Sequence, residues 1–322
     1  MRRRIKINFA DCWDGPKHDY RQDPIYRFLC RHYEVEISDK PEYLFCEVLG
    51  HDDLKYDCVK IVTTGENMVP DFSRYDYVMG FDYIEFGDRY LRSPLYIRYG
   101  EYEKLKGEGE RPDPQKLLDR KFCSFVVSNP DADPMREKFF RELSKYKKVD
   151  SGGRYLNNVG GPVKDKLEFC ARYKFNIAIE NSAYPGYVTE KVMQPLTVHS
   201  VPIYYGDPLI HNDFTPECMV RIRSKDDIER AIEEIIALDN DDERYLQKCL
   251  APRLVKPWDY YERQREEFLL HIIEQPLSQA RRTVDYGYQA WTRSQLRRLY
   301  RLSDLLHSPL RTLKSLRHLL GR

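Results

Sequence analysis

The sequence predicts an α/β protein of two Rossmann-like lobes followed by a basic, amphipathic helical tail. Short β-rich runs alternate with helical patterns along most of the chain, which is typical of parallel sheets covered by helices. The length of 322 residues is enough for two domains of roughly 100 to 200 residues each. A segment rich in glycine, proline and charge at 104–114 separates two such series. We expect an N-terminal lobe at 1–118, a C-terminal lobe at 119–279 and a tail at 280–322.

The first lobe is expected to contain short strands and one helix. Each expected strand is a run of β-branched, aromatic or other apolar residues next to charged or turn-forming residues. These runs lie at 5–9, 33–37, 43–48, 58–63 and 75–81, and the helical pattern lies at 24–32.

The second lobe continues the alternation of strands and helices. Expected strands lie at 122–128, 149–150, 175–180, 201–205 and 219–222. Expected helices lie at 134–146, 163–173, 188–199 and 225–237. Pro195 falls inside the third of these helices, where its ring would clash with the carbonyl of Lys191 at a cost of about 3 kcal/mol. We therefore expect a kink or the end of the helix at this point.

The tail combines a leucine stripe with basic residues. Between 294 and 320 leucines recur at helical spacing, and arginines and lysines occupy much of the remaining surface. Ser308-Pro309 is expected to divide the tail into two helices. A basic amphipathic helix is typical of attachment to an anionic membrane surface. Two alternatives are a homodimer formed through the tail and a tail that docks on its own body.

The charge balance argues against nucleic acid as a partner. The chain has 53 Lys and Arg against 52 Asp and Glu, so there is no overall basic excess. The distribution is uneven, because the tail has ten Lys and Arg against two Asp. The first 279 residues are mildly acidic, with 43 basic against 50 acidic side chains.

Cysteine usage and the N-terminus predict the compartment. The eight cysteines form no CxxC pair, and most lie in apolar runs where a free thiol packs as a small hydrophobe. The first residues lack the apolar region of a signal peptide, and no run of about 18 apolar residues could span a bilayer. We expect a cytoplasmic protein that is peripheral on the inner membrane face if the tail attaches it there.

The segment 175–208 carries the most specific information. It reads FNIAIENSAYPGYVTEKVMQPLTVHSVPIYYGDP, an apolar strand that leads through a tight loop into a helix. A helix N-terminus at the carboxyl end of a strand attracts phosphate. A bound anion would favour Lys191 in the first turn, and the carboxylate of Glu190 suits the two hydroxyls of a ribose. On the residues alone, a first-turn acid beside a solvated lysine explains the pair equally well.

This segment resembles the nucleotide-binding motif of the α1,3-fucosyltransferases of glycosyltransferase family 10. The resemblance rests on ENSAYPGYVTEK followed by VPIYYGDP, and it is greatest to the bacterial enzymes that add Lewis-type antigens to lipopolysaccharide. It continues in TTGEN at 63–67, in YDYVMGFDYIEFGDRYLRSPLY at 75–96 and in FVVSNPDADPMREKFF at 125–140. The resemblance therefore covers most of residues 1 to about 260.

The resemblance implies a GT-B glycosyltransferase fold, with the acceptor on the N-terminal lobe and GDP-fucose on the C-terminal lobe. The match to YVTEK implies that Glu190 binds the ribose and Lys191 the diphosphate. Asn181 and Tyr187 are implied to line the same donor pocket, and the match to SNPDADPMR implies that Arg136 also binds the diphosphate. Arginine offers a fork suited to phosphate oxygens and lysine a compact charge.

By the same resemblance Glu66, in TTGEN, is the general base. Inversion needs one carboxylate to take the proton of the attacking hydroxyl, and Glu66 follows an apolar strand and a glycine. A surface turn acid is the alternative interpretation of this residue. Asp82 and Glu85 are other acids of the same lobe that could act as the base.

No metal or other cofactor is expected. The family's enzymes work without a metal, and two cations at a helix N-terminus can neutralise a leaving diphosphate. Asp131-Ala132-Asp133 and Asp239-Asn240-Asp241 spell DxD, but we interpret the first as a helix cap and the second as a turn. The eight histidines show no spacing typical of zinc ligands.

The sequence therefore predicts a metal-independent inverting transferase. It would move L-fucose from GDP-β-L-fucose to the 3-OH of GlcNAc in Galβ1,4GlcNAc acceptors such as N-acetyllactosamine, which is Lewis X synthesis. One alternative is the same fold with α1,4 or another acceptor specificity. Others are a non-catalytic glycan- or nucleotide-binding protein tethered by its tail, and a membrane-surface scaffold whose working part is the tail.

Overall fold

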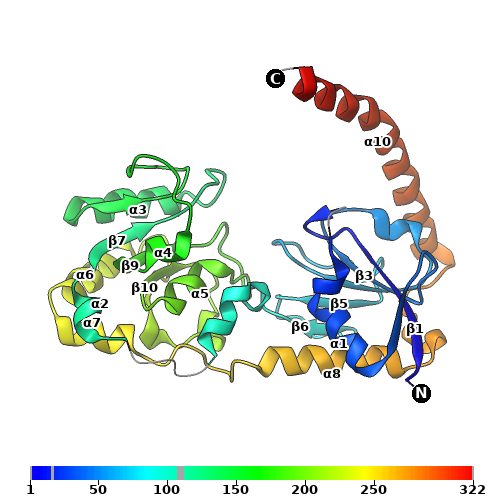
Figure 1. Ribbon diagram of the computed structural model, residues 1–322, viewed down its shortest axis with the longest axis horizontal. Coiled ribbons are helices and arrows are strands. Elements are labelled where there is room, and N and C mark those ends of the chain that lie inside the picture. Colours follow the sequence, from blue (N-terminus) through cyan, green and yellow to red (C-terminus); the bar gives the residue numbers. More distant parts are fainter. Residues whose placement is uncertain (1, 16–17, 107–111, 321–322) are drawn as a thin grey trace. The chain divides into compact units, whose positions relative to one another are not determined.

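The computed structural model describes residues 2–15, 18–106 and 112–320. The chain forms two compact units, each built on its own β-sheet (Figure 1). Unit 1 consists of Met1–Gly80, Phe86–Leu91 and Arg265–Arg322. Unit 2 consists of Phe81–Glu85 and Arg92–Gln264. The predicted α/β fold with two Rossmann-like lobes is confirmed.

The sheet of unit 1 has the strand order β2-β1-β3-β4-β5-β6, and its first five strands in the chain pair in parallel. Its strands are β1 Arg4–Ala10, β2 Glu34–Ile37, β3 Tyr43–Glu47, β4 Val59–Thr63, β5 Tyr77–Gly80 and β6 Tyr90–Arg92. Helix α1, Pro24–His32, has the predicted bounds because Asp23 caps it, accepting a hydrogen bond from Ile25 N at 2.7 Å. Strand β6 was not predicted, since three half-buried residues give too short a pattern.

The sheet of unit 2 is entirely parallel, with the order β11-β10-β9-β7-β8. Its strands are β7 Lys121–Phe125, β8 Val149–Ser151, β9 Tyr173–Ile179, β10 Val201–Tyr205 and β11 Val220–Arg221. Its helices are α2 Pro114–Leu118, α3 Met135–Tyr146, α4 Lys166–Cys170, α5 Glu190–Thr197, α6 Ile228–Asp239 and α7 Asp242–Cys249. Helix α5 ends two residues after Pro195, as predicted.

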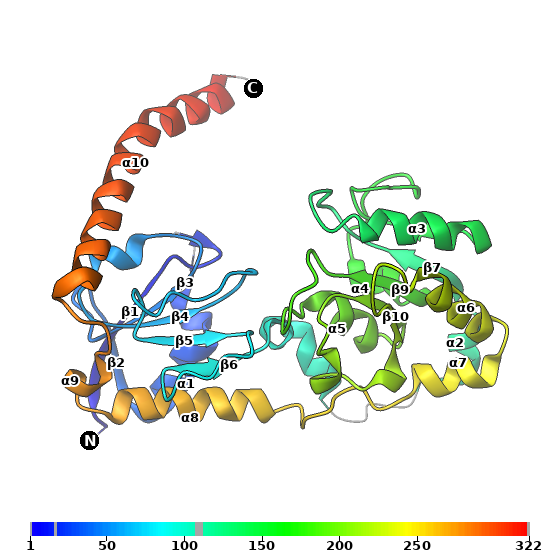
Figure 2. The ribbon, with the colours of Figure 1, turned by 180° about the vertical axis from the view of Figure 1, so that it is seen from behind.

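Helices cover both faces of this sheet (Figure 2). Phe175 and Ile177 of β9 pack in one core with residues of α3, α6 and α7. Ala178 of β9 and Tyr204 of β10 point to the opposite face and pack with α5. Because successive side chains of a strand alternate between faces, a strand buried on both sides is apolar throughout. All seven residues of β9 are buried.

The units do not follow the predicted boundaries at 118 and 279. Residues 92–118 belong to unit 2, where Tyr96 and Tyr102 pack in the core of α5. Helix α8, Tyr260–Glu274, carries the chain into unit 1, where Leu269 and Ile272 are fully buried in the core beneath β1 and β3. An apolar helix face predicts burial but does not predict which sheet it covers.

The C-terminal segment is helical. After α9, Leu277–Ala280, a single helix α10 extends over Gly287–Leu320 as a long curved rod (Figure 2). The predicted division at Ser308-Pro309 is wrong. Leucine and arginine on both sides of the proline favour helix strongly enough to continue it through this point. Among the described residues, no helix has the length and apolarity needed to cross a membrane.

The start of α10 is attached to unit 1, and its middle is not covered. Tyr300 stacks on His51 with ring centroids 4.2 Å apart, and Arg293 donates to the carbonyl of Ser73. Leu302 and Leu305 are exposed by 58% and 71%. The eight cysteines are free, as predicted, and six of them are buried.

Candidate functional site

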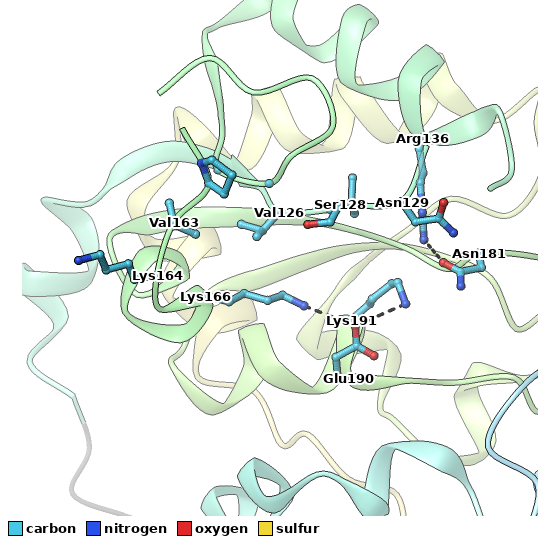
Figure 3. A pocket seen from close by; sticks show the side chains of 14 residues that line it. Val126, Ser128, Asn129, Arg136, Val163, Lys164, Lys166, Asn181, Glu190 and Lys191 are labelled. Atoms are coloured by element: carbon cyan, nitrogen blue, oxygen red, sulfur yellow. Dashed lines mark hydrogen bonds and ion pairs between the residues drawn. The ribbon is translucent and has the colours of Figure 1, made fainter. Parts of the chain in front are cut away.

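A pocket of about 400 Å³ lies in unit 2 at the carboxyl ends of three neighbouring strands, β8, β7 and β9 (Figure 3). Open parallel sheets bind ligands at this edge. One part of the lining is apolar and includes Val126, Val127, Pro162 and Val163. The polar part includes Asn129, Arg136, Asn181, Lys164, Lys166, Glu190 and Lys191. Four of the five predicted donor-binding residues therefore meet in one pocket.

Arg136 and Asn181 are brought together across 45 residues of sequence. The Arg136 guanidinium is buried and donates through Nε to the carbonyl of Ile179 at 3.0 Å. Its Nη2 donates to Asn181 Oδ1 at 2.6 Å (Figure 3). Burial lowers the pKa of Arg136, but a guanidinium remains charged at any physiological pH. The two bonds fix the orientation of the fork, and the sequence did not predict this pairing.

The loop between β9 and α5 is shaped by a glycine and closed by a cap. Gly186 has a φ of +85°, and a Cβ at this position would lie 2.3 Å from the carbonyl oxygen of Phe81. Thr189 is the N-cap of α5, and its hydroxyl accepts from Lys191 N at 3.4 Å. The helix N-terminus therefore begins at the pocket with Glu190 and Lys191 in its first turn.

Glu190 lies between two lysines. Its Oε1 is 3.5 Å from Lys191 Nζ and 3.6 Å from Lys166 Nζ (Figure 3). Burial would raise the pKa of Glu190, but Lys191 and Lys166 lower it to about 2. Glu190 is therefore an ionised hydrogen-bond acceptor over the physiological range. Sequence reasoning missed Lys166, because a lysine at the start of a short helix carries no distinctive signal.

Lys191 is a partly buried cation at the same helix end. Its Nζ lies 3.3 Å from Glu180 Oε2 as well as 3.5 Å from Glu190. Burial would lower the pKa of Lys191, but Glu180 and Glu190 raise it. The pocket thus combines four cationic side chains, a helix N-terminus and an apolar wall. This combination can hold a diphosphate joined to a planar, partly apolar group.

Tyr187, also expected in the donor pocket, is not one of the residues that line it. Its ring is buried and packs edge-on against Phe81, with centroids 5.4 Å apart. The turn at Gly186 directs the tyrosine into a small apolar cluster with Phe81 and Leu95. In this structure Tyr187 therefore anchors the loop through packing with Phe81 and Leu95.

Glu66 lies in unit 1, in a bend just beyond the carboxyl end of β4. Its side chain is partly exposed, and among the described residues its carboxylate makes no hydrogen bond or ion pair. Of the other two acids considered, Asp82 is buried beside Tyr184, and burial raises the pKa of Asp82. Glu85 is exposed.

The two DxD segments act as caps and turns. Asp133 accepts from Met135 N at 3.0 Å at the start of α3. Asp241 accepts from Arg244 N at 3.1 Å and caps α7, as expected for a polar turn before a helix. Within the described part of the chain, no group of three or more His, Cys, Asp or Glu side chains could hold a metal ion.

Two family models match the chain in order. The N-terminal domain of alpha-(1,3)-fucosyltransferase FucT matches residues 7–99, which include Glu66. The C-terminal part of glycosyltransferase family 10 (fucosyltransferase) matches residues 118–249, which include every residue that lines the pocket. The chain belongs to glycosyltransferase family 10.

This family 10 chain spans only part of the length of the curated relatives that it matches. The alpha-(1,3)-fucosyltransferase FucT of Helicobacter pylori is 32% identical over 286 residues, which are 75% of this chain and 59% of that protein. The human 3-galactosyl-N-acetylglucosaminide 4-alpha-L-fucosyltransferase FUT3 is 29% identical over 160 residues, which are 48% of this chain and 43% of that protein. The bovine GDP-fucose protein O-fucosyltransferase 3 is 30% identical over 181 residues, 51% of this chain and 38% of that protein.

Solved structures agree with the family. A crystal structure of an alpha1,3-fucosyltransferase with GDP-fucose matches with a TM-score of 0.69 and 27% identity, over 84% of this chain and 91% of that one. The structure of such an enzyme with GDP matches with a TM-score of 0.71 over 85% and 91% of the two chains. The family 10 chain therefore shares the fold of these fucosyltransferases.

Proposed function

We propose that the protein is an inverting fucosyltransferase that takes L-fucose from GDP-β-L-fucose. The observation that carries the proposal is the convergence of Arg136, Lys166 and Lys191 with Glu190 at the N-terminus of α5. Membership of family 10 and the fold shared with a GDP-fucose-bound enzyme support it. The related enzyme from Helicobacter pylori carries α1,3-fucosyltransferase in its name.

In this proposal each part of the pocket takes one part of the donor. Arg136 and Lys191 bind the diphosphate, the ionised Glu190 accepts hydrogen bonds from the ribose hydroxyls, and the apolar wall of Val126 and Val163 covers the base. Asn181 holds the Arg136 fork in place. No metal is needed, since the cations and the helix N-terminus neutralise the charge that develops on the leaving GDP.

The proposed reaction is a single displacement. The acceptor hydroxyl oxygen attacks the anomeric carbon of fucose, its proton passes to the carboxylate of Glu66, and the bond from that carbon to the β-phosphate oxygen breaks. GDP leaves with the electron pair of that bond. A carboxylate that is partly exposed and has no partner among the described residues is available as such a base.

The proposed acceptor position is the 3-OH of GlcNAc in a Galβ1,4GlcNAc glycan, which gives Lewis X. Its support is the α1,3 designation of the relative that matches the largest share of this chain among those named above. The human and bovine relatives carry 4-alpha and protein O-fucosyl names, and they match about half of this chain. Type 1 glycans are therefore the informative comparison acceptors.

The deciding experiment is an incubation of the purified protein with GDP-fucose and N-acetyllactosamine in EDTA, followed by mass spectrometry. A trisaccharide with an α-fucosyl linkage by NMR would support transfer, inversion and independence from metal together. GDP binding without product on any acceptor would favour a non-catalytic binding protein. Absence of GDP binding would refute the proposed donor chemistry.

We further propose a cytoplasmic location, with α10 attaching the protein to the inner membrane face. The exposed side chains of Leu299, Leu302 and Leu305, on a helix rich in arginine, support this. Vesicles with and without anionic lipid test it, and Leu302→Gln with Leu305→Gln should reduce sedimentation with anionic vesicles. Dimerisation through α10 is the other outcome, which would appear as a dimer that these substitutions dissociate.

A further inference from the structure

Glu180 is a buried carboxylate directly behind the pocket. It follows the last residue of β9 and has no exposed surface. Its oxygens accept from Thr189 N at 2.8 Å and from Thr189 Oγ1 at 2.7 Å. One of them also lies 3.3 Å from Lys191 Nζ. These contacts reach the N-cap and the first turn of α5, although Glu180 does not line the pocket.

The end of β10 packs closely against the Glu180 side chain. Glu180 N donates to the carbonyl of Tyr205 at 2.9 Å, which fixes its backbone beside β10. A Cβ on Gly206 would lie 2.5 Å from Glu180 Cγ. A side chain at position 206 would therefore displace the glutamate. The packing holds the carboxylate in one place.

The ammonium group of Lys191 has three nearby acceptors for its three protons. These are Glu180 Oε2 at 3.3 Å, Glu190 Oε1 at 3.5 Å and Thr189 Oγ1 at 3.1 Å. Glu190 is partly exposed, whereas Glu180 and Thr189 are buried. A ligand that engages Glu190 therefore frees one proton of Lys191 without disturbing the other two contacts.

We propose that Glu180 is a positioning residue of the donor site, which holds the Lys191 ammonium group towards the diphosphate while Glu190 turns to the ribose. The inference rests on the proposed GDP-fucose chemistry. Without Glu180, Lys191 would keep only one carboxylate partner, Glu190, which is the group that the ribose engages. The donor would then meet a lysine that has lost its buried carboxylate partner.

The charges around Lys191 give the direction of the effect. Its pKa is raised by Glu180 and Glu190 against the effect of burial, and Arg136 opposes them. Removal of Glu180 therefore lowers the pKa of Lys191. The titratable groups that face Lys191 or its partner Glu190 are Glu180 after β9, Tyr187 in the loop, Arg136 on α3, Lys166 on α4, and Tyr99.

The test uses Glu180→Gln, which keeps the shape and an acceptor oxygen but removes the charge. The matched control is Asp213→Asn, because Asp213 is also a fully buried carboxylate of unit 2 and pairs with Arg92 at 2.6 Å away from the pocket lining. Glu180→Asp keeps the charge but shortens the reach to Lys191. It serves as the second variant if Glu180→Gln does not fold.

The first measurement is the rate at which acetic anhydride acylates Lys191 as a function of pH, read by peptide mass spectrometry without nucleotide. At pH 9 we expect Lys191 to react about tenfold faster in Glu180→Gln, because a lower pKa leaves more of its amine unprotonated. Glu180→Asp should give a smaller increase and Asp213→Asn none. An unchanged rate in Glu180→Gln, or an equal increase in the control, would overturn the inference.

The second measurement is GDP affinity by calorimetry between pH 7 and 9. Relative to the unmodified protein, Glu180→Gln should lose more affinity as the pH rises over this range, and the titration of GDP itself cancels in the comparison. Equal pH dependence in both proteins would overturn the role of Glu180. Failure of the unmodified protein to bind GDP would instead refute the proposed function, while the acylation result would still report on Glu180 and Lys191.

Discussion

Replacing Arg136 by lysine keeps the positive charge of the pocket but removes the planar fork. The guanidinium makes two hydrogen bonds, to the carbonyl of Ile179 at 3.0 Å and to Asn181 Oδ1 at 2.6 Å. A lysine ammonium at the end of a flexible chain can keep only one of them in this geometry. One charge-assisted hydrogen bond is worth about 1.5 to 3 kcal/mol.

We therefore expect Arg136→Lys to lower GDP affinity by up to roughly a hundredfold, since 1.4 kcal/mol is a factor of ten in binding. Part of the loss should appear as a lower free energy of unfolding, because the carbonyl of Ile179 is left buried without its donor. Calorimetry with GDP and urea unfolding measure the two parts separately.

The control is Arg141→Lys, one turn further along α3. Arg141 is 62% exposed and pairs with Glu137 on the surface. Exposed ion pairs contribute little, so this variant should bind GDP and unfold like the unmodified protein. If Arg136→Lys folds and binds GDP within twofold of the unmodified protein, the fork is not what holds the diphosphate.

Three further predictions concern Glu66 as the base, the loop at Gly186 and the stability of the protein at acid pH. Glu66→Gln should lose transfer by at least about a hundredfold with unchanged GDP affinity, and unchanged transfer would remove Glu66 from the mechanism. Gly186→Ala should lower the free energy of unfolding by about 1 to 3 kcal/mol more than Gly160→Ala. Both glycines have positive φ, but of the two only Gly186 lies close to a backbone carbonyl, that of Phe81. Equal losses in urea unfolding would contradict the close approach. Lys191 and Lys166 lower the pKa of Glu190 to about 2 from an ordinary 4.5, so its contribution to stability is present above pH 4.5 and lost as the pH falls towards 2. Glu190→Gln should therefore flatten the fall in the free energy of unfolding over this pH range. An unchanged fall would show that Glu190 is not ionised between the two lysines.

Several elements could be predicted because their causes are local. Helix α1 has a capping aspartate and a proline at its start, and β10 is a continuous apolar run, so the expected bounds 24–32 and 201–205 are those observed. Arg136, Asn181, Glu190 and Lys191 were expected at one site because their motifs are long and specific, and the structure places them in one pocket.

Other features depend on neighbours that are distant in sequence. The apolar face of α8 predicts burial, but only the packing of Leu269 and Ile272 shows that it covers the sheet of unit 1. Tyr187 belongs to the same motif as Glu190, yet its side chain packs against Phe81 behind the loop. Lys166 reaches Glu190 from another helix, with no signal in the sequence around it.

The sequence by itself determined the alternation of strands and helices, the helix N-terminus at the end of β9 and the family, because these follow from residue type and short spacing. Only the tertiary structure decided which charges share the pocket. Glu180 is an ordinary acid after an apolar strand in the sequence, and it becomes the buried partner of Lys191 only where β9, β10 and α5 pack together. Burial and charge pairing are properties of residues that meet in space, and hydrophobic periodicity along the chain does not encode which residues meet.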